Sequence, residues 1–338
     1  MARNLFGIQW HITEKCDQRC KHCYIFNGRN QSENELSIDI LKDILKDFIF
    51  TCKKMEKIPI LTITGGDPLL YPNVWKFFEA LKENNIKFSI LGNPFHLDAK
   101  VAKALKNLGC YNYQMSIDGI KSTHDFIRKS GSFDETLKKV KVLNDAKIHS
   151  SIMTTVSKLN IDEIPDLIPI LVKAKVKNFG FARYCPNPND FDSMVSPDEY
   201  KAFLEKMWKV FVKYKDNGTR FALKDHLWKL FLYEKGLFDI SYEEDFIVDG
   251  CHCGITHMTI LPDGTVYACR RCESPIGKVP QQSLYDIFFG KALDSYRQYD
   301  KFEKCNNCEL FKFCRGCPAV SKCVTGNFYA PDPQCWKK

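Results

Sequence analysis

The 338-residue sequence predicts an α/β protein, a partial (β/α)6 barrel followed by a cysteine-rich C-terminal domain. Two observations lead to this fold class. Short runs rich in β-branched and aromatic residues alternate six times with amphipathic segments of helical period, which indicates parallel strands joined by right-handed helical crossovers. Ten of the sixteen cysteines then lie between Cys251 and Cys335, after the alternation has ended.

The barrel elements follow one another along the first half of the chain. We expect strands at residues 5–12, 60–64, 88–91, 113–117, 150–156 and 179–183. Helices with one apolar face are expected at 38–52, 74–84, 98–108, 134–146 and 161–175. Ser37 is a suitable N-cap for the first helix. Because ligands bind at the carboxyl ends of parallel strands, polar residues directly after strands are the candidate site residues.

Beyond the last of these strands the pattern changes. Prolines mark a linker, and further helices are expected at 196–215 and 221–236. A hairpin of two short strands about a turn is expected within 261–269. The domains predicted from these changes are the barrel at 1–186, a helical insert at 187–249 and the cysteine-rich domain at 250–338.

The composition indicates a soluble, cytoplasmic protein. The chain has no basic-then-apolar N-terminal segment and no apolar run of about 18 residues. Sixteen cysteines in a reducing compartment indicate metal or cluster ligation and not disulfides. The formal net charge of +8 is spread over helix-like segments, so we expect neither a nucleic acid nor a membrane as partner.

The N-terminal cysteines carry the most specific motif. Cys16, Cys20 and Cys23, followed by Tyr24, have the spacing C-x-x-x-C-x-x-C directly after the first strand. A [4Fe-4S] cluster has four irons, so three thiolates leave one iron for a ligand that is not protein. A zinc site would need a fourth ligand, and His22 is badly placed beside Cys23 to complete a tetrahedron.

This motif resembles the signature of the radical S-adenosylmethionine (SAM) enzymes. The resemblance implies that SAM chelates the fourth iron and is cleaved to a 5'-deoxyadenosyl radical. Gly-Gly-Asp-Pro after the second strand resembles the family's Gly-Gly-Glu-Pro motif, which holds the amino group of SAM; Asp67 replaces the glutamate. The resemblance implies that Tyr24, Gly65, Gly66, Asp67 and the Ser-x-Asp residues Ser116 and Asp118 bind the cofactor. Position at the end of a strand adds Asn93, Thr154 and Arg183 as candidates.

Some of these residues also have simpler interpretations. Asp118 and Gly119 would suit a plain turn, and Thr154 suits any strand because it is β-branched. Arg183 is expected to bind the SAM carboxylate, where bidentate pairing is favourable. A salt bridge unrelated to the cofactor is the alternative for this arginine.

The C-terminal cysteines resemble the SPASM extension of radical SAM enzymes, which carries two auxiliary [4Fe-4S] clusters. Cys314 and Cys317 are separated by two residues where the family has three, and Cys272 and Cys323 have no assigned role. A zinc-binding domain built on C-x-x-C pairs is the alternative. The resemblance implies a first cluster on Cys251, Cys253, Cys269 and Cys317, and a second on Cys305, Cys308, Cys314 and Cys335.

The same resemblance implies hydrogen abstraction from a peptide or protein, followed by thioether or carbon-carbon crosslinking. A reductant such as flavodoxin or ferredoxin is the second expected partner. A small-molecule or tetrapyrrole substrate is the first alternative. Oxidation of the sulfatase-maturase kind is another, although Arg270 stands where an acidic residue is expected. A cluster-bound or zinc-bound binding protein is the alternative that is not an enzyme. The candidate catalytic residues are Cys185 and Arg270.

Overall fold

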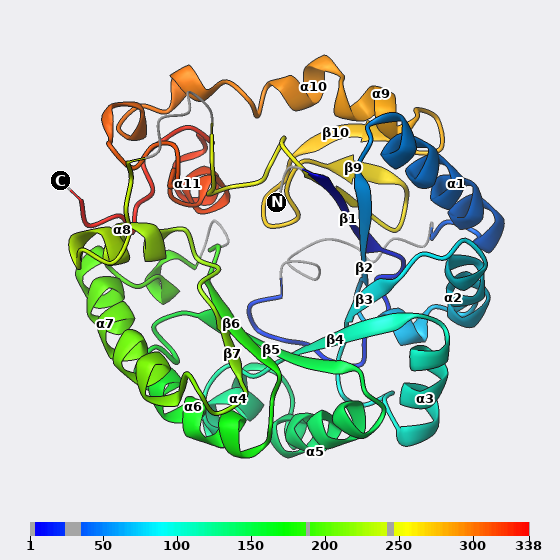
Figure 1. Ribbon diagram of the computed structural model, residues 1–338, viewed down its shortest axis with the longest axis horizontal. Helices are drawn as coiled ribbons and strands as arrows, with labels where there is room; N and C mark the ends of the chain where they lie inside the picture. The colour runs from blue at the N-terminus through cyan, green and yellow to red at the C-terminus, as the bar shows by residue number, and fades with distance from the viewer. Residues whose placement is uncertain (1–3, 24–34, 187–189, 242–246, 338) are drawn as a thin grey trace. The chain divides into compact units, whose positions relative to one another are not determined.

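The computed structural model describes residues 4–23, 35–186, 190–241 and 247–337, and the chain divides into two compact units (Figure 1). The first unit comprises Met1–Ser116, Asp125–Ile152 and Cys253–Arg297. The second comprises Ile117–His124, Met153–His252 and Gln298–Lys338. Each unit therefore combines three separate segments of the sequence.

The first unit is built on a mostly parallel sheet. Strand β1 pairs in parallel with β2 on one side and with β8 on the other, and β2, β3 and β4 continue the parallel order. The hairpin partners β9 and β10 are antiparallel. The strands are β1 (Leu5–His11), β2 (Ile58–Thr64), β3 (Phe88–Leu91), β4 (Cys110–Ser116), β8 (His257–Ile260), β9 (Thr265–Tyr267) and β10 (Pro275–Lys278).

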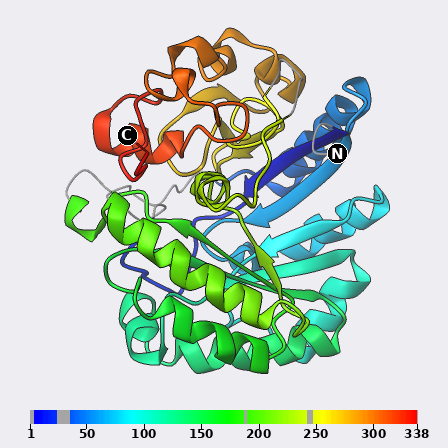
Figure 2. The same ribbon diagram turned by 60° about the vertical axis from the view of Figure 1, so that its left-hand side comes forward.

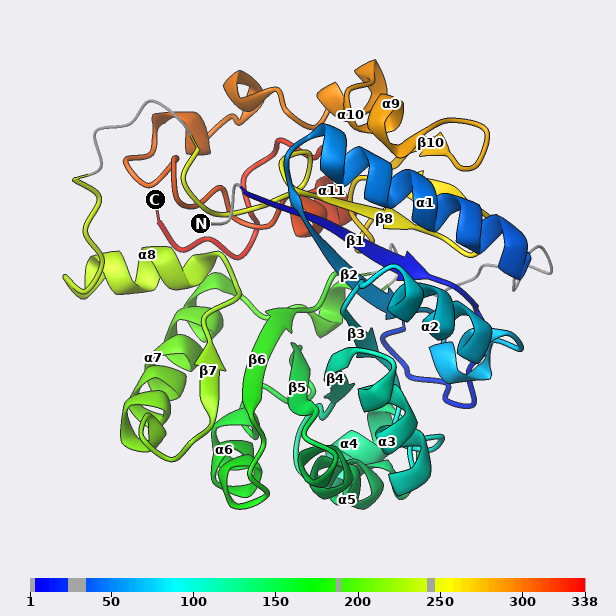
Figure 3. The same cartoon turned by 45° about the vertical axis from the view of Figure 1, so that its right-hand side comes forward.

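Helices cover one face of this sheet. The helix α1 (Ile38–Lys54) begins where Ser37 accepts a hydrogen bond from the amide of Ile40, as expected for an N-cap. Figure 3 shows α1 and α2 beside the first strands. The other helices of this unit are α2 (Val74–Glu83), α3 (Ala99–Asn107), α5 (Ser132–Asp145), α9 (Leu284–Phe288) and α10 (Lys291–Asp294), with a 3-10 turn at Pro68–Leu70.

Strand β1 shows how the two faces of the sheet differ. Phe6 packs its ring on Phe48 of α1 and Phe288 of α9, and Trp10 packs on Phe77 of α2. Because side chains alternate along a strand, Gln9 lies on the opposite face. The helix-covered face is thus an apolar core, whereas the other face carries polar side chains.

The second unit contains the last strands of the parallel series and a group of aromatic helices. Strand β5 (His149–Val156) runs from the first unit into the second, and β6 (Asn178–Arg183) pairs in parallel with β7 (Arg220–Ala222). Figure 2 shows the long helix α7, which begins at a capping box formed by Ser196 and Glu199. The helices of this unit are α6 (Ile164–Lys173), α7 (Pro197–Tyr214), α8 (Leu227–Glu234) and α11 (Pro318–Thr325), with 3-10 turns at Phe191–Ser193, Tyr299–Lys301 and Cys305–Asn307. The helix α4 (Lys121–Ile127) has residues in both units.

The predicted fold class, an α/β partial barrel, is confirmed. The strand order ends at β10 and at β7, so the sheet is open and does not close into a barrel. No helix among the described residues is long and apolar enough to cross a lipid bilayer. The predicted boundaries of the barrel, insert and C-terminal domain stay predictions.

Two element predictions were wrong in detail, and one helix was not predicted. The helix expected at 221–236 begins at Leu227, because Arg220–Ala222 pairs with β6 as a strand. The hairpin expected within 261–269 has its first strand before that range, in β8, where pairing with β1 extends the parallel sheet. The sequence analysis also missed α4. Both wrong predictions concern segments that pair in the sheet with residues distant in sequence. The local sequence pattern does not reveal such pairing.

Candidate metal centre

The three cysteines of the N-terminal motif lie in one loop after β1. The amide of Cys23 donates to the carbonyl oxygen of Cys20 at 3.0 Å, which folds the second half of the loop into a turn. The Sγ atom of Cys16 accepts a hydrogen bond from the amide of Gln18 at 3.4 Å. All three thiols are partly exposed and outside disulfides. Tyr24 lies outside the described residues.

The glycines after β2 hold this loop at close range. The amide of Gly66 donates to the carbonyl oxygen of Thr13 at 2.9 Å, and the amide of Asp67 donates to that of Lys15 at 2.7 Å. A Cβ added at Gly65 would collide with the backbone of Thr13, and one at Gly66 would collide with the backbone of Lys15. Only glycine allows the two backbones to approach in this way. The Gly-Gly turn therefore fixes the residues that lead into Cys16.

Asp67 anchors the same turn from within. Its Oδ1 accepts from the amide of Leu69 at 2.9 Å, and its Oδ2 accepts from the amide of Asn93 at 3.3 Å. Burial raises the pKa of the Asp67 carboxyl to about 6, although these hydrogen bonds and His96 act in the opposite direction. The carboxyl consequently joins the turn after β2 to the segment after β3.

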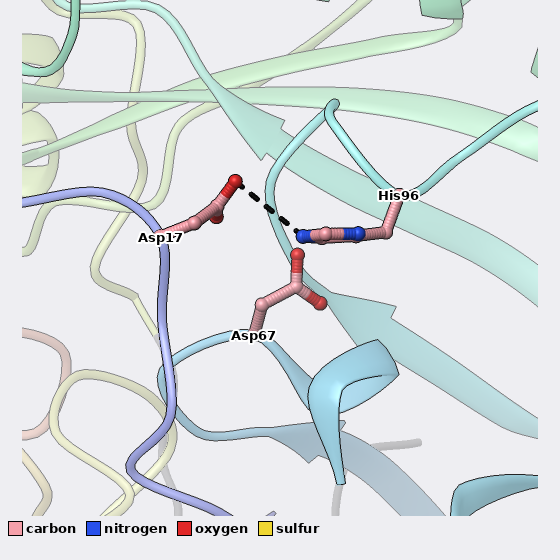
Figure 4. Close-up of side chains that lie close together, drawn as sticks. All are labelled: Asp17, Asp67 and His96. Carbon is pink, nitrogen blue, oxygen red and sulfur yellow. Dashed lines mark ion pairs between the residues drawn. The ribbon is translucent and has the colours of Figure 1, made fainter.

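Two further side chains converge on Asp67, as Figure 4 shows. His96 lies 3.4 Å from a carboxylate oxygen of Asp17, and one ligand atom from each of Asp17, Asp67 and His96 lies within 4.8 Å of the others. Lys129 also approaches Asp17, at 3.7 Å. The sequence analysis missed Asp17 and His96. Their positions in the sequence could have indicated them, because Asp17 directly follows Cys16 and His96 follows the third strand.

Asn93 lies beside the first cysteine. Its Nδ2 donates to Asp17 at 2.7 Å and lies 3.9 Å from the Sγ of Cys16. Its backbone carbonyl accepts from the hydroxyl of Tyr113 at 3.0 Å, and the side chain is buried. The sequence-predicted residue Asn93 is thus brought to the cysteine loop, where its amide points to a thiol sulfur.

A second segment, residues 127–132, holds the loop from another side. The guanidinium of Arg128 donates to the Sγ of Cys20 at 3.6 Å, and its other terminal nitrogen lies 3.4 Å from Nε2 of His22. The amide of Lys21 donates to the carbonyl oxygen of Ile127 at 2.9 Å. The sequence analysis missed Arg128, because no local pattern connects it to residues more than a hundred positions earlier.

The loop fits a cluster held by three cysteines. Burial raises the pKa of the Cys16 thiol to about 11, so its thiolate needs a positive partner such as iron. Hydrogen-bond donors reach two of the sulfurs, from Gln18 and Asn93 to Cys16 and from Arg128 to Cys20. N–H donors aimed at thiolates are the expected surroundings of an iron-sulfur cluster.

The residues predicted to contact ribose and adenine make structural bonds in the second unit. Asp118 is fully buried, its amide donates to Nδ1 of His124 at 3.0 Å, and its Oδ1 accepts from the amide of Thr155 at 2.7 Å. The hydroxyl of Thr154 donates to the carbonyl oxygen of Ile117 at 2.6 Å. These bonds order the segment after β4. Contacts of Asp118 and Thr154 with SAM stay predictions, as does one from Ser116, which is half-buried at the end of β4.

Arg183 has other partners than the one predicted. Its Nε donates to Asp225 at 2.9 Å, and its two terminal nitrogens each donate to Asp332 at 2.7 Å. One terminal nitrogen also donates to Gln334 at 3.0 Å, and the side chain is fully buried. The guanidinium thus forms the salt bridges that were the alternative for this arginine, and its binding of the SAM carboxylate stays a prediction.

Four C-terminal cysteines gather in the second unit. Burial and the neighbouring thiols of Cys335 and Cys308 raise the pKa of Cys305 to about 11. Burial, with Cys335 among the further causes, raises the pKa of Cys314 to about 12. Interactions of this kind place Cys305, Cys308, Cys314 and Cys335 near one another. These are the four residues expected for the second auxiliary cluster, and buried thiolates again require a cation.

The other predicted cluster ligands are divided between the units. Cys253, whose thiol lies 3.4 Å from the carbonyl oxygen of Ala268, belongs to the first unit together with Cys269. Cys251 and Cys317 belong to the second, where both thiols raise the pKa of His226 against the effect of burial. The four-cysteine set of the first auxiliary cluster therefore stays a prediction.

The five remaining cysteines have no assigned ligand role. Cys52, Cys110 and Cys272 are buried, Cys323 lies on α11, and Cys185 is half-buried directly after β6. A catalytic role for Cys185 stays a prediction. It rests on the position of this residue after a parallel strand.

A polar row crosses the face of the first unit's sheet that is opposite the helices. Register places the five side chains of this row side by side on β8, β1, β2, β3 and β4: Thr259, Gln9, Thr62, Ser89 and Asn112. Thr62 and Ser89 are hydrogen-bonded at 2.9 Å. Arg270, the second candidate catalytic residue, donates to Gln9 at 2.8 Å. The sequence analysis missed this row, although the alternation of Phe6, Ile8 and Trp10 with polar residues was its signal.

Two family models match the chain, and several known proteins resemble it. Residues 10–168 match the family model described as the Radical SAM superfamily, and residues 251–318 match the iron-sulfur cluster-binding domain SPASM. The AdoMet-dependent heme synthase of Methanosarcina barkeri is 25% identical over 97% of this chain and 95% of its own length. The Fe-coproporphyrin III synthase of the same organism is 27% identical, covering 97% of this chain and 87% of the relative. The cysteine-type anaerobic sulfatase-maturating enzyme of Clostridium novyi is 25% identical over 90% of this chain and 85% of its own.

Solved structures share the fold. Streptococcus suis SuiB bound to its precursor peptide SuiA has a TM-score of 0.76 and 18% identity, covering 99% of this chain and 76% of that one. A structure of anSMEcpe with bound AdoMet has a TM-score of 0.77 and 16% identity, over 98% of this chain and 90% of that one. At these identities the likeness supports the architecture alone.

Proposed function

Because the chain is a radical SAM protein with a C-terminal SPASM domain, we propose that it abstracts a hydrogen atom from its substrate with a radical derived from SAM. The observation that carries this proposal is the three-thiol loop, with donors to two of its sulfurs and a glycine turn that admits no side chain. A reduced [4Fe-4S] cluster bound there supplies the electron that cleaves SAM. The protein's own part is to hold the cluster, orient SAM and exclude water.

The cysteines of the loop and the side chains beside them have separate roles in holding the cluster. Cys16, Cys20 and Cys23 would bind three irons of the cluster and leave the fourth iron to SAM. Asn93 and Arg128 donate hydrogen bonds toward the sulfurs of Cys16 and Cys20, which disperse thiolate charge and favour the reduced state.

The acidic side chains beside the loop suit the ammonium group of SAM. Asp17 and Asp67 lie next to Cys16 and offer carboxylate oxygens close together. Gly65 and Gly66 bring the backbone of the turn to the same place. Ser116, Asp118 and Thr154 are the expected contacts for the remainder of the cofactor, and Tyr24 follows the loop.

The SPASM domain would hold two auxiliary [4Fe-4S] clusters. The set of Cys305, Cys308, Cys314 and Cys335 is the better supported one, since their thiols interact within one unit. The first set would combine Cys251, Cys253, Cys269 and Cys317. Electrons would come from a protein such as flavodoxin or ferredoxin.

A peptide or protein is the proposed substrate, with a thioether or carbon-carbon crosslink as the product. Two similarities support it. The fold resembles SuiB in complex with a precursor peptide, and the sporulation killing factor maturation protein SkfB of Bacillus subtilis is 24% identical over 82% of this chain and 63% of its own length. Cys185 would then lie on the unit that carries the last strands.

A tetrapyrrole is the second candidate substrate. It is favoured by one observation: the heme synthase and coproporphyrin synthase relatives align over nearly the whole of both chains. Oxidation of the sulfatase-maturase kind has less support, since Arg270 replaces the acid expected there. Both alternatives use the same cofactor chemistry.

The proposal is tested on protein reconstituted without oxygen. We expect about twelve irons per chain and 5'-deoxyadenosine from SAM after reduction. Replacing Cys16, Cys20 and Cys23 together by Ala should abolish 5'-deoxyadenosine and retain the C-terminal iron. Cys52→Ala, at a buried thiol of α1, is the matched control and should keep both. Zinc in place of iron, without SAM cleavage, would leave a metal-bound binding protein.

A further inference from the structure

The polar row is unusual for the interior of an α/β unit. Thr259, Gln9 and Ser89 are buried, yet none is apolar. Burying polar side chains is unfavourable unless they find partners, and apolar residues would form a better core at this position. A buried polar face is, however, what a binding site requires, where a few polar groups orient a ligand. A charged group beside this row that has no oppositely charged partner would mark such a site.

Arg270 is that group. Its Nη1 donates to Oε1 of Gln9 at 2.8 Å, and among the described residues this neutral amide is its hydrogen-bond partner. No carboxylate in the described part of the chain forms an ion pair with it. A guanidinium has five N–H donors, and two parallel bonds to a carboxylate are its preferred arrangement. Arg183 shows this arrangement in the same protein, because its two terminal nitrogens donate to the two carboxylate oxygens of Asp332. Arg270 is half-buried and keeps donors for a ligand.

The surroundings of Arg270 are basic. His11 lies two residues beyond Gln9 on the same face of β1, and its ring nitrogen is 3.4 Å from the Gln9 amide. His257 precedes Thr259 of the row by two residues and lies 3.3 Å from its hydroxyl. Both Arg270 and His257 act electrostatically on His11, which is buried. Burial and these two neighbours keep His11 uncharged, so the guanidinium of Arg270 supplies the positive charge of this polar face. A positive charge on a polar face is complementary to an anion.

We propose that Arg270 binds a carboxylate of the substrate, oriented by Gln9 and flanked by His11 and His257. This inference rests on the proposed function and narrows it, because it requires that the substrate carry a carboxylate. Two sources fit that chemistry, the propionate group of a tetrapyrrole and an acidic side chain of a peptide. In either case the guanidinium holds the substrate and takes no proton from it.

The test measures access to the guanidinium in the reconstituted holoprotein. Phenylglyoxal, which modifies arginine side chains, is applied without oxygen, and the modified positions are found by peptide mass spectrometry. The variant Arg271→Gln leaves Arg270 as the sole arginine of the pair, and Arg270→Gln leaves Arg271 as the matched control. The wild type is labelled in parallel, so that the result does not depend on a variant. The probes are propionate, coproporphyrin III and a short peptide with one glutamate. Propionamide and the glutamine form of the peptide are the neutral controls.

We expect carboxylate probes to slow the labelling of Arg270 several-fold, and neutral probes to leave it unchanged. Labelling of Arg271 should respond to neither. Protection by coproporphyrin III alone would assign a tetrapyrrole, and protection by the acidic peptide alone would assign a peptide. The inference is overturned if Arg270 does not react, if neutral probes protect it equally, or if Arg271 is protected in the same way.

A second measurement gives the strength of binding and separates the two proposals. Binding of the probe that protects Arg270, coproporphyrin III or the acidic peptide, is followed by ultrafiltration. It should weaken about 10- to 100-fold in Arg270→Gln and stay within about twofold in Arg271→Gln. SAM cleavage is measured on the same wild-type preparation. Carboxylate protection without SAM cleavage would remove the proposed function and keep the anion site. SAM cleavage without carboxylate protection of Arg270 would keep the proposed function and remove the anion site.

Discussion

The α-carbon of Gly66 lies against the carbonyl oxygen of Lys15, so close that no side chain fits between them. This approach fastens the end of β2 to the residue directly before Cys16, and the amide of Asp67 strengthens it by donating to the same carbonyl. The position of the first cluster ligand is therefore set by a glycine fifty residues later in the chain.

Replacing Gly66 by Ala should displace the loop, because the new Cβ would collide with backbone and not with a movable side chain. Misplacement of a cofactor by about 1 Å can lower a rate on the order of a hundredfold. We expect at least about a tenfold loss of 5'-deoxyadenosine formation. The control is Gly7→Ala, whose Cβ would lie 3.5 Å from the carbonyl oxygen of Thr256, an ordinary contact. Equal rates for both variants would contradict this account of the turn.

Arg128 should raise the reduction potential of the cluster held by the loop. Its N–H group lies 3.6 Å from the Sγ of Cys20, and hydrogen bonds to cluster sulfurs stabilise the more negative, reduced state. We expect Arg128→Gln to shift the potential downward on the order of 50 mV, equivalent to about 1 kcal/mol for one electron. Redox titration followed by electron paramagnetic resonance measures it. Arg19→Gln is the control, because Arg19 lies in the same loop and donates to the carbonyl oxygens of Cys16 and Gln18. An equal shift in both variants would indicate a charge effect without a specific bond.

Arg183 and Asp332 should stabilise the second unit as a pair. Both side chains are buried, so removing one partner leaves an uncompensated charge. We expect Arg183→Met to lower the free energy of unfolding by about 3 to 5 kcal/mol. The double variant Arg183→Met with Asp332→Leu should recover part of that loss. The midpoint of urea denaturation gives the comparison.

The control for this pair is an exposed one in the same unit. Lys206 and Asp162 lie 3.2 Å apart on the surface. Lys206→Met should change the free energy of unfolding by less than about 1 kcal/mol. If Arg183→Met behaved like Lys206→Met, the network would be structurally dispensable, and the predicted contact of Arg183 with SAM would gain support.

His11 should make the first unit sensitive to acid. Burial, followed by Arg270 and His257, lowers its pKa from 6.5 to about 3. The unfolded chain therefore binds a proton between these values that the folded chain does not, so stability falls as the pH falls below about 6.5. Between pH 7.5 and 5.5 we expect a loss on the order of 1 kcal/mol. Urea unfolding of the wild type and of His11→Gln at both pH values measures it. In His11→Gln the free energy of unfolding should fall less between these two pH values. An equal fall in the variant and the wild type would refute the role of His11 in the acid sensitivity.

The sequence by itself determined the fold class and the family of the protein, and it predicted the metal ligands. The alternation of strand-like and helix-like runs is a local property, so it predicted the α/β fold without any knowledge of contacts. Cys16, Cys20 and Cys23 lie within one short loop, and their spacing alone limits the geometry that a cluster can adopt. The Gly-Gly-Asp turn was recognised for the same reason.

Only the tertiary structure decided which side chains meet across long distances in sequence. Arg128 reaches Cys20, and Arg270 reaches Gln9, because sheet pairing and loop packing bring those segments together. Strand β8 joined the sheet beside β1 for the same reason, although its own sequence suggested a separate hairpin.

Arg183 shows the difference between what the local sequence predicts and what the tertiary structure decides. Its position after a parallel strand predicted a ligand contact, but a guanidinium binds whichever carboxylate is nearest and desolvated. The fold supplies Asp225 and Asp332, which lie 42 and 149 residues away along the chain. Local pattern therefore predicts where a charged group lies along a strand, whereas the partner that satisfies it is decided by the packing of distant segments.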